Sequence, residues 1–433
     1  MIEKIARRCS GRCRWWEVLH TEGSSTPVTF KNNRLYSITE RQNAGSGIRV
    51  NVEKRTGFSY TNDTRMVDET LERAINMSSY GEEEHFMIPS ALPDTEVHTR
   101  DDAIDDYSVQ EEVEKGKNAI DRILQVLPDA QVDLGISGGS GRRVIMNSEG
   151  FDAGFSYSTY SVSIGALMVM DDGVRLNVHE GMSTLAPSSY DTLADDVIKK
   201  MQQGMVIRSL PSGKYPVLFS PKAFVSLLGI CTSGLSARAV YKGISPYEGK
   251  LGEQLFNKAF DVRDMPLLDD AVGSYPFDDE GVQAREKALI DNGKVSTFVT
   301  DLKYAEKLDI EPTGNASRGY AGLPSPGFSN IVVKPGSLGI EECMKNSDKC
   351  ILVEQFIGFG QSNTLTGQFT ANLDLAFLVE NGEVTGRLKD CMLSDNVFEL
   401  LKGDIALSDT PRWVGSVNLP YLYCPAVNYT AQG

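Results

Sequence analysis

Residues 376–388 read AFLVENGEVTGRL and identify the C-terminal part of the chain as β structure. The pair Asn381-Gly382 separates two extended runs, and an Asn-Gly pair in this setting is the strongest short-range signal of a β-hairpin. Asn292-Gly293 has the same setting. The further candidate strands are residues 217–219, 286–291, 296–300, 330–334 and 351–355. These patterns predict a mostly β C-terminal domain over residues 211–433.

Upstream, residues 108–210 alternate between helical and extended patterns. Ser108 and Glu111 form a capping box before an apolar stripe that Pro128 ends, which predicts a long helix. Extended runs follow at residues 132–136, 143–146 and 155–170. Leu193, Val197, Met201 and Met205 then mark a second amphipathic helix. We therefore expect a middle α+β domain.

Residues 1–82 predict an N-terminal α+β domain, because short extended runs separated by Gly, Asn and Asp precede one amphipathic helix near residues 67–78. Residues 83–107 are acidic, weakly patterned and contain two prolines, so we interpret them as a linker. The predicted fold is α+β: N-terminal and middle units of mixed hairpin sheets covered by helices, followed by the mostly β C-terminal domain.

Composition excludes several functional classes. The 433 residues are 41% apolar and 24% charged, as in ordinary globular proteins. A formal net charge of -16 repels phosphate backbones, so direct binding of DNA or RNA is disfavoured. No window reaches the roughly 20 apolar residues of a membrane span, and no apolar stretch follows the basic N-terminus as in a secretory signal. We expect a cytoplasmic protein whose seven cysteines are reduced.

Histidine is scarce, which limits the metal and acid–base chemistry available to the chain. All four histidines precede residue 180, and no HExxH pair is present. A zinc peptidase site built on histidines within this chain alone is therefore excluded. Cys9 and Cys13 are interpreted as ordinary thiols, because no second ligand pair is placed to complete a metal site.

Two other motifs carry weaker signals. Residues 135–139, GISGG, match the GxSxG pattern of hydrolases, but a nucleophile elbow needs a helix directly after Ser137, and the following residues are extended. We interpret this run as a glycine hairpin loop. Residues 278–280, Asp-Asp-Glu, lack the spacing of a calcium loop and are interpreted as a solvated or capping turn.

The loop at residues 313–319, TGNASRG, is small, polar and carries one cation. Asn315 and Arg318 are therefore our candidates for contacting a peptide carbonyl or carboxylate. A purely structural turn remains the alternative for this loop.

Several segments, taken in order, resemble the TldD/PmbA family. They are residues 47–50, 55–58, 147–150, 249–253, 277–282, 289–294, 313–316, 365–369 and 379–383. The resemblance covers most of the chain, and the collinear order of the segments makes a chance match improbable. It implies peptide-bond chemistry, since the TldD subunits of that family are zinc metallopeptidases and the PmbA (TldE) subunits are their partners.

The resemblance also implies where the zinc ligands of the TldD branch would stand. That branch carries HExxxH, and counting back from the shared segment that ends at residues 249–253 puts Leu228, Gly229 and Ser233 at the positions of the first His, the Glu and the second His. Its C-terminal cysteine ligand would fall near Trp413, whereas Cys391 and Cys424 lie well away from that position. The chain therefore resembles the PmbA-type, zinc-less subunit, with no catalytic residue, metal ligand or cofactor of its own.

Two functions of different class follow from this resemblance. In the first, the chain binds extended peptide for a homologous, zinc-bearing TldD-like subunit in a heteromeric peptidase. In the second, it is an independent homodimeric binding module for peptides or proteins, without a role in proteolysis. The family's older label as a modulator of DNA gyrase would then describe an indirect effect through protein targets, given the acidic charge.

Overall fold

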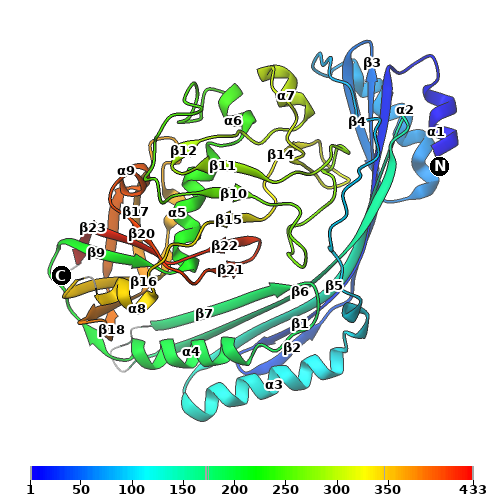
Figure 1. Cartoon of the computed structure of the whole chain (residues 1–433). Coiled ribbons are helices and arrows are strands. Elements are labelled where there is room, and N and C mark those ends of the chain that lie inside the picture. The colour runs from blue at the N-terminus through cyan, green and yellow to red at the C-terminus, as the bar shows by residue number, and fades with distance from the viewer. Residues whose placement is uncertain (1, 171–172, 174, 346, 432–433) are drawn as a thin grey trace.

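The computed structural model describes residues 2–170, 173, 175–345 and 347–431. Figure 1 shows a long, curved sheet with helices on its outer face and a β-rich C-terminal body facing its concave side. The fold is α+β with a mostly β C-terminal region, as the sequence predicts. No described helix combines the length and the hydropathy of a membrane span.

The curved sheet combines strands from both halves of the first 210 residues. Its described strands are β1 (Trp15–Lys31), β2 (Arg34–Ile38), β3 (Arg41–Val52), β4 (Arg55–Thr61), β5 (Gln131–Asn147), β6 (Asp152–Val169) and β7 (Arg175–Thr184). The order is β4-β3-β1-β5-β6-β7, with β2 also paired to β1. β1 and β5 are antiparallel, from Glu17 opposite Asn147 to Phe30 opposite Leu134. The N-terminal and middle strands therefore form one continuous sheet.

The glycine run at residues 135–139 lies inside β5, so its interpretation as a hairpin loop is wrong. A Cβ atom at Gly139 would lie 2.3 Å from the carbonyl oxygen of Ser24 in β1, and one at Gly138 would meet the ring of Tyr107. These glycines permit close approach of the neighbouring backbone and ring, which is a common role of glycine within strands. The residues after Ser137 are extended and not helical, so Ser137 does not stand on a nucleophile elbow.

Helices cover the ends and the outer face of the sheet. They are α1 (Ile2–Cys9), α2 (Val67–Ser78), α3 (Val109–Val126) and α4 (Asp191–Gly204), with short 3-10 turns at Thr64–Met66 and Asp102–Asp106. The Ser108 side chain accepts a hydrogen bond from the Glu111 N–H, which confirms the predicted cap of α3. Ile120 and Ile123 of α3 pack with strand residues such as Leu134 in one buried cluster.

The acidic segment at residues 83–107 packs against the rest of the protein. Phe86 and Ile88 share a buried cluster with Trp15 of β1 and Leu302 of the C-terminal region. The His98 N–H donates to the Asp269 carboxylate at 2.7 Å. This segment thus connects the sheet to the C-terminal body through a buried apolar cluster and an exposed hydrogen bond.

The C-terminal region contains two main sheets. One has the order β16-β9-β23-β19-β17-β18-β8, with β20 also paired to β23, and the other has the order β12-β11-β10-β15-β22-β21. The strands of the first are β8 (Ile207–Arg208), β9 (Gly213–Phe219), β16 (Lys349–Ile357), β17 (Gln368–Glu380), β18 (Glu383–Leu388), β19 (Cys391–Asn396), β20 (Ala406–Leu407) and β23 (Leu422–Ala431). Those of the second are β10 (Val262–Asp264), β11 (Lys287–Asp291), β12 (Lys294–Val295), β15 (Ile331–Val333), β21 (Arg412–Val414) and β22 (Val417–Leu419).

Both Asn-Gly pairs form the predicted turns. Asn381 and Gly382 have φ angles of 51° and 84° between β17 and β18, and Asn292 and Gly293 have 47° and 79° between β11 and β12. Positive φ at both central residues is the signature of the hairpin turn that favours Asn-Gly. The strand predicted at residues 296–300 does not form. In this stretch the structure has an isolated bridge from Val299 to Ser236 in place of a strand.

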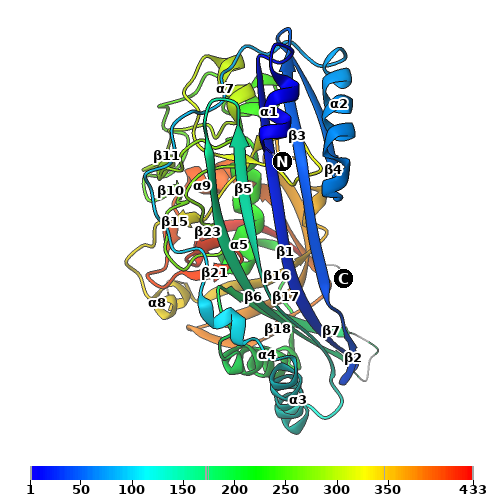
Figure 2. The same ribbon diagram turned by 90° about the vertical axis from the view of Figure 1, so that its right-hand side faces the viewer.

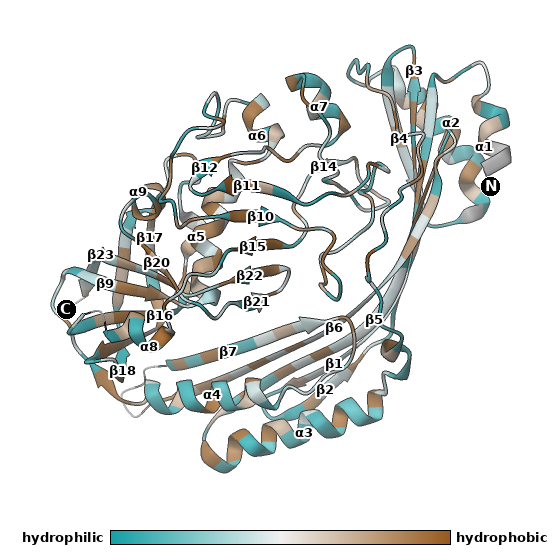
Figure 3. Ribbon diagram, in the orientation of Figure 1, coloured by the Kyte–Doolittle hydropathy of each residue, from teal (hydrophilic) through white to brown (hydrophobic). Residues whose placement is uncertain are grey.

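The central helix of this region is α5 (Pro221–Ser233), which packs against β16, β21 and β22. Its Ser220 side chain caps the helix by accepting from the Ala223 N–H, and Pro221 occupies the first turn, where proline is favoured. Figure 3 shows that β15, with the sequence Ile-Val-Val, is strongly apolar. The smaller elements are α6 (Ala237–Tyr241), α7 (Leu302–Leu308), α8 (Ile340–Lys345), α9 (Val397–Lys402), a 3-10 turn at Phe359–Gln361 and the pair β13 (Ala316–Ser317) and β14 (Ser325–Pro326).

Candidate functional site

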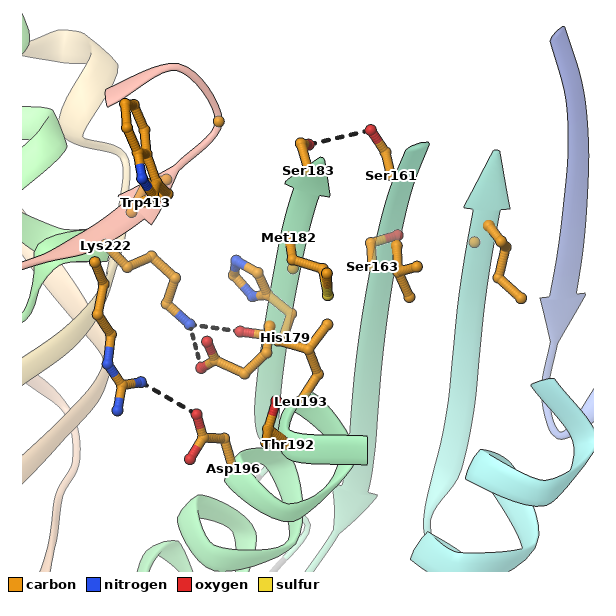
Figure 4. Close-up of a pocket in the computed structure, with 18 of the residues that line it drawn as sticks. Ser161, Ser163, His179, Met182, Ser183, Thr192, Leu193, Asp196, Lys222 and Trp413 are labelled. Carbon is orange, nitrogen blue, oxygen red and sulfur yellow. Dashed lines mark hydrogen bonds and ion pairs between the residues drawn. The ribbon is translucent and has the colours of Figure 1, made fainter. Parts of the chain in front are cut away.

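A cavity of about 970 Å³ lies between the curved sheet and the C-terminal body (Figure 4). The strands β1, β5, β6 and β7 contribute one wall, the helix α4 a second, and the start of α5 with the β21–β22 hairpin a third. β7 is the last strand of its sheet and β21 is the last strand of the other, and the two strands are in contact. Two sheet edges therefore meet at this cavity.

The sheet wall of the cavity is formed by small polar and apolar side chains. Ser137, Ser161 and Ser163 lie on it, and Ser183 bonds to Ser161 through their hydroxyl oxygens at 3.1 Å. Opposite them, Trp413 of β21 is 41% exposed and lines the cavity. A polar sheet face with one large aromatic side chain suits an elongated ligand that offers both main-chain groups and apolar side chains.

Lys222, in the first turn of α5, ties the C-terminal body to the edge of β7. Its Nζ donates to the His179 carbonyl oxygen at 2.5 Å, to Glu180 Oε1 at 2.9 Å and to Gln355 Oε1 at 2.9 Å. The His179 N–H donates to Gln355 Oε1 at 3.1 Å. These bonds show that the main-chain groups of His179 face away from β6 and towards the C-terminal body.

Lys200 of α4 completes a group of four largely buried charges with Lys222, Glu180 and Glu354. Its Nζ lies 2.8 Å from both Glu180 Oε1 and Glu354 Oε2. Burial acts against the ionised form of Glu180, but Lys222 and Lys200 outweigh it and lower the pKa of that carboxyl. Burial lowers the pKa of Lys222, and the charge of Lys200 acts in the same direction. The positive and negative charges balance, so this end of the cavity is polar without a net charge.

The structure shows where Leu228, Gly229 and Ser233, the three positions expected to replace HExxxH, lie on α5. Leu228 is 1% exposed and belongs to the apolar core. Gly229 is exposed and faces open space, two turns after Lys222, which puts the two residues on the same helix face. The Ser233 hydroxyl donates to the Ile230 carbonyl oxygen at 2.8 Å. None of these side chains offers an imidazole, a carboxylate or a thiolate, so they do not fit a zinc ion.

Trp413 stands close to this helix in the fold, because β21 packs against α5. The cavity is lined by Trp413 and by the start of α5 at Ser220, Pro221 and Lys222, rather than by Leu228, Gly229 or Ser233. Among the residues that the structure describes, no group of three or more His, Cys, Asp or Glu side chains is placed to hold a metal ion.

Asn315 and Arg318, the candidates from the sequence, lie in a different place. Asn315 is 1% exposed, donates from Nδ2 to Asp264 at 2.8 Å and accepts from Lys287 at 2.8 Å. It borders a smaller cleft of about 290 Å³. Arg318 is buried, and its guanidinium forms an ion pair with Glu17 of β1. The structure does not bring these two residues to the larger cavity.

The acidic run at residues 278–280 is buried, so its interpretation as a solvated turn is wrong. Asp278 caps its own turn by accepting from the Glu280 and Val282 N–H groups, which is the capping alternative. Glu280 receives the Arg49 guanidinium at 2.6 Å, and Asp279 receives that of Arg143 at 2.5 Å. The run is buried because cations from the curved sheet reach it, and these cations are distant in sequence.

Comparison with known proteins identifies the family. Residues 16–78 match domain 1, residues 102–205 the central domain and residues 212–431 the C-terminal domain of the PmbA/TldA metallopeptidases. The chain belongs to the PmbA/TldD metallopeptidase family. The crystal structure of TldE from Thermococcus kodakarensis has the same fold, with a TM-score of 0.90 over 99% of this chain and 100% of that one, at 21% identity.

Relatives within the PmbA/TldD family share low identity over nearly their whole length. A metalloprotease of Methanocaldococcus jannaschii is 25% identical over 91% of this chain and 89% of its own. A metalloprotease PmbA homologue of Haemophilus influenzae is 22% identical over 91% of this chain and 87% of its own. The likeness extends through the curved sheet, α5 and both C-terminal sheets, so it includes every wall of the cavity.

Sequence reasoning missed most of the cavity. Lys200, Lys222, Glu180 and Glu354 belong to four different elements, and no motif connects them. Trp413 was singled out only through the family resemblance. Two local signals do fall at the cavity: the GISGG run, whose Ser137 lies on the sheet wall, and the pair Ser220-Pro221, which fixes the start of α5 and hence the position of Lys222.

Proposed function

We propose that this chain is the non-catalytic, zinc-less PmbA/TldE-like subunit of a TldD-type metallopeptidase assembly. In this role it binds unfolded or extended polypeptide, and a homologous zinc-bearing subunit supplies the metal that activates water. The observation that carries the proposal is the set Leu228, Gly229 and Ser233 on α5, because these residues keep the helix of the family but offer zinc no ligand. A partner chain is therefore required for hydrolysis.

The edge of β7 supports the binding part of this proposal. Successive residues of a strand turn their main-chain groups to opposite sides, so Gly181 and Ser183 present theirs on the same side as His179. Both residues line the cavity. An extended peptide that adds to such an edge is held through main-chain hydrogen bonds, with little demand on its sequence. Trp413 and Met182, on the cavity wall, then offer apolar contacts to its side chains.

Replacing Gly181 with proline is expected to weaken peptide binding by about tenfold, because it removes one main-chain donor and adds a ring at the edge. Proline is tolerated on the free side of an edge strand, so β7 and β6 should stay paired. The measurement is the anisotropy of a fluorescent, unstructured peptide titrated with the protein.

Gly181→Ala is the matched control, since it adds a methyl group but keeps the N–H. Its Cβ would lie 3.2 Å from the Val162 carbonyl oxygen, a contact that a small shift relieves. Equal affinities for the wild type and Gly181→Pro, with both variants folded, would rule out the β7 edge as the peptide site.

A further inference from the structure

Two cysteines lie beside each other where α1 ends. Cys9 is the last residue of α1, and Cys13 lies in the turn that leads into β1. The Cys13 N–H donates to the Cys9 carbonyl oxygen at 3.0 Å, which closes one turn of α-helical size. Such a turn places the two Cα atoms about 6 Å apart, within the span of a disulfide bond. The two thiols also share a hydrogen bond.

The two thiols differ in their access to solvent. Cys9 is 2% exposed and belongs to a buried cluster with Ile5 of α1 and Val18 of β1, whereas Cys13 is half-buried at the border of that cluster. Figure 2 shows α1 at the end of the curved sheet that also carries α2. All seven cysteines lie in the described part of the chain, and the other five are buried. A small reagent in the solvent therefore reaches Cys13 first.

Positive charge gathers around the pair, although the chain as a whole is acidic. Residues 7–14 include four arginines and no carboxylate, and Glu72 of α2 pairs with Arg12 at 2.8 Å. The hydrogen bond from Cys9 lowers the pKa of the Cys13 thiol, and the Arg12 charge acts in the same direction against the effect of burial. The same hydrogen bond, together with burial, raises the pKa of Cys9. Cys13 thus offers the thiolate, which is the reactive form of cysteine, and Cys9 keeps its proton.

We propose that Cys13 and Cys9 are a peroxide-sensitive pair that forms a reversible disulfide bond. A solvent-accessible thiolate beside a second, resolving cysteine is the usual arrangement of such sites. The Cys13 thiolate attacks one oxygen of hydrogen peroxide, the O–O bond breaks, hydroxide leaves and Cys13 becomes a sulfenic acid. The Cys9 sulfur then attacks the Cys13 sulfur, the S–O bond breaks, and the Cys9 proton leaves with the hydroxyl group as water. The two cysteines are oxidised, the peroxide is reduced, and a thiol reductant restores both thiols.

The disulfide ties the end of α1 to the segment that leads into β1. Because only three residues separate the two cysteines, the bond removes little freedom from the unfolded chain, and the fold is expected to stay the same. Transient disulfides of this kind also occur in reducing compartments. Neither cysteine lines the cavity beside Lys222, so the inference does not depend on the proposed function.

Mass spectrometry of the reduced, full-length chain tests the proposal. Cleavage after lysine releases residues 5–31 as one peptide, which contains both cysteines and no other. After treatment with hydrogen peroxide, denaturation and alkylation, we expect this peptide to carry no alkyl group and to weigh two hydrogens less than the reduced peptide. Dithiothreitol before alkylation should restore two alkyl groups. A peptide that is alkylated twice after peroxide treatment, or one that is linked to a second copy of itself, would overturn the proposal.

Single substitutions assign the roles of the two thiols. Cys9→Ser should leave Cys13 as a sulfenic acid that dimedone labels, and Cys13→Ser should leave Cys9 unlabelled. Cys391→Ser, which removes a buried cysteine from β19, is the matched control and should form the disulfide as the wild type does. Equal melting temperatures check that the variants fold, and the wild-type peptide decides the proposal if one of them does not. Dimedone labelling of Cys9 in Cys13→Ser as strong as that of Cys13 in Cys9→Ser would contradict the assigned order of reaction.

Discussion

Replacing Arg49 with alanine is expected to lower the free energy of unfolding by about 3–5 kcal/mol. Arg49 of β3 is 3% exposed and donates to Glu280 at 2.6 Å and to Glu17 at 3.2 Å. Both carboxylates are fully buried. Removing one partner of a buried ion pair is costly, because it leaves charge in a medium of low dielectric constant without compensation. Since Glu280 belongs to the C-terminal region, the loss should also loosen that region from the curved sheet.

Urea denaturation followed by circular dichroism measures this effect. Arg12→Ala is the matched control, because Arg12 donates to Glu72 at 2.8 Å from an exposed position. Exposed pairs contribute about 0–1 kcal/mol, so the control should change stability little. If Arg49→Ala and Arg12→Ala lowered the free energy of unfolding equally, the buried ion pairs of Arg49 would stabilise the fold no more than an exposed pair does.

Asparagine in place of Asp301 is expected to stabilise the protein at pH 8 by up to about 4 kcal/mol and to change stability little at about pH 4. Asp301 is 1% exposed, and burial together with the nearby Glu280 raises the pKa of its carboxyl to about 7. The folded protein thus holds this proton more tightly than the unfolded chain does. The contribution of Asp301 to stability is therefore lost as the pH rises from about 4 to about 7.

The Asp301→Asn change is close to isosteric at this position. The Asp301 Oδ1 atom caps α7 by accepting from the Tyr304 N–H at 2.7 Å, and an amide oxygen can accept the same bond. Among the described residues no donor reaches the Oδ2 atom. The free energy of unfolding of the variant is compared with that of the wild type at each pH, which cancels the effect of the other titrating groups.

Asp63→Asn provides a contrast of opposite sign. A hydrogen bond from Arg65 lowers the pKa of Asp63 to about 2, so this exposed carboxylate stabilises the fold when it is charged and loses that effect as the pH falls. An Asp301→Asn variant that is less stable than the wild type at pH 8 would show that the ionised carboxylate of Asp301 does not destabilise the folded protein.

Local sequence signals predicted the elements whose geometry is set within a few residues. The Asn381-Gly382 turn requires two positive φ angles, and the cap of α3 requires one hydroxyl oxygen at Ser108, so residue type alone identifies both. The partner of a strand carries no such local signal. The pairing of Glu17 with Asn147 in β1 and β5, which joins two units into one sheet, therefore could not be predicted from periodicity.

Features of the site could be predicted from the sequence only where the presence or absence of one residue type decides the chemistry. The absence of histidine after residue 179 in the sequence argues against a zinc site in the C-terminal region, independently of which residues stand at positions 228 and 229. Charged residues were misjudged, since the run at Asp278 looks like a surface turn until its cationic partners are known. The four charges beside Lys222 come from separate elements, so only the fold brings them together.

Cleavage of an unstructured polypeptide, assayed with this chain alone, with a zinc-bearing homologue alone and with both, tests most directly the claim that this chain supplies binding rather than chemistry. We expect no cleavage by this chain alone, because Leu228, Gly229 and Ser233 give zinc no ligand, and faster cleavage by the pair than by the homologue alone. Cleavage by this chain alone that resists a chelator would contradict the claim. So would a homologue that is equally active with and without this chain.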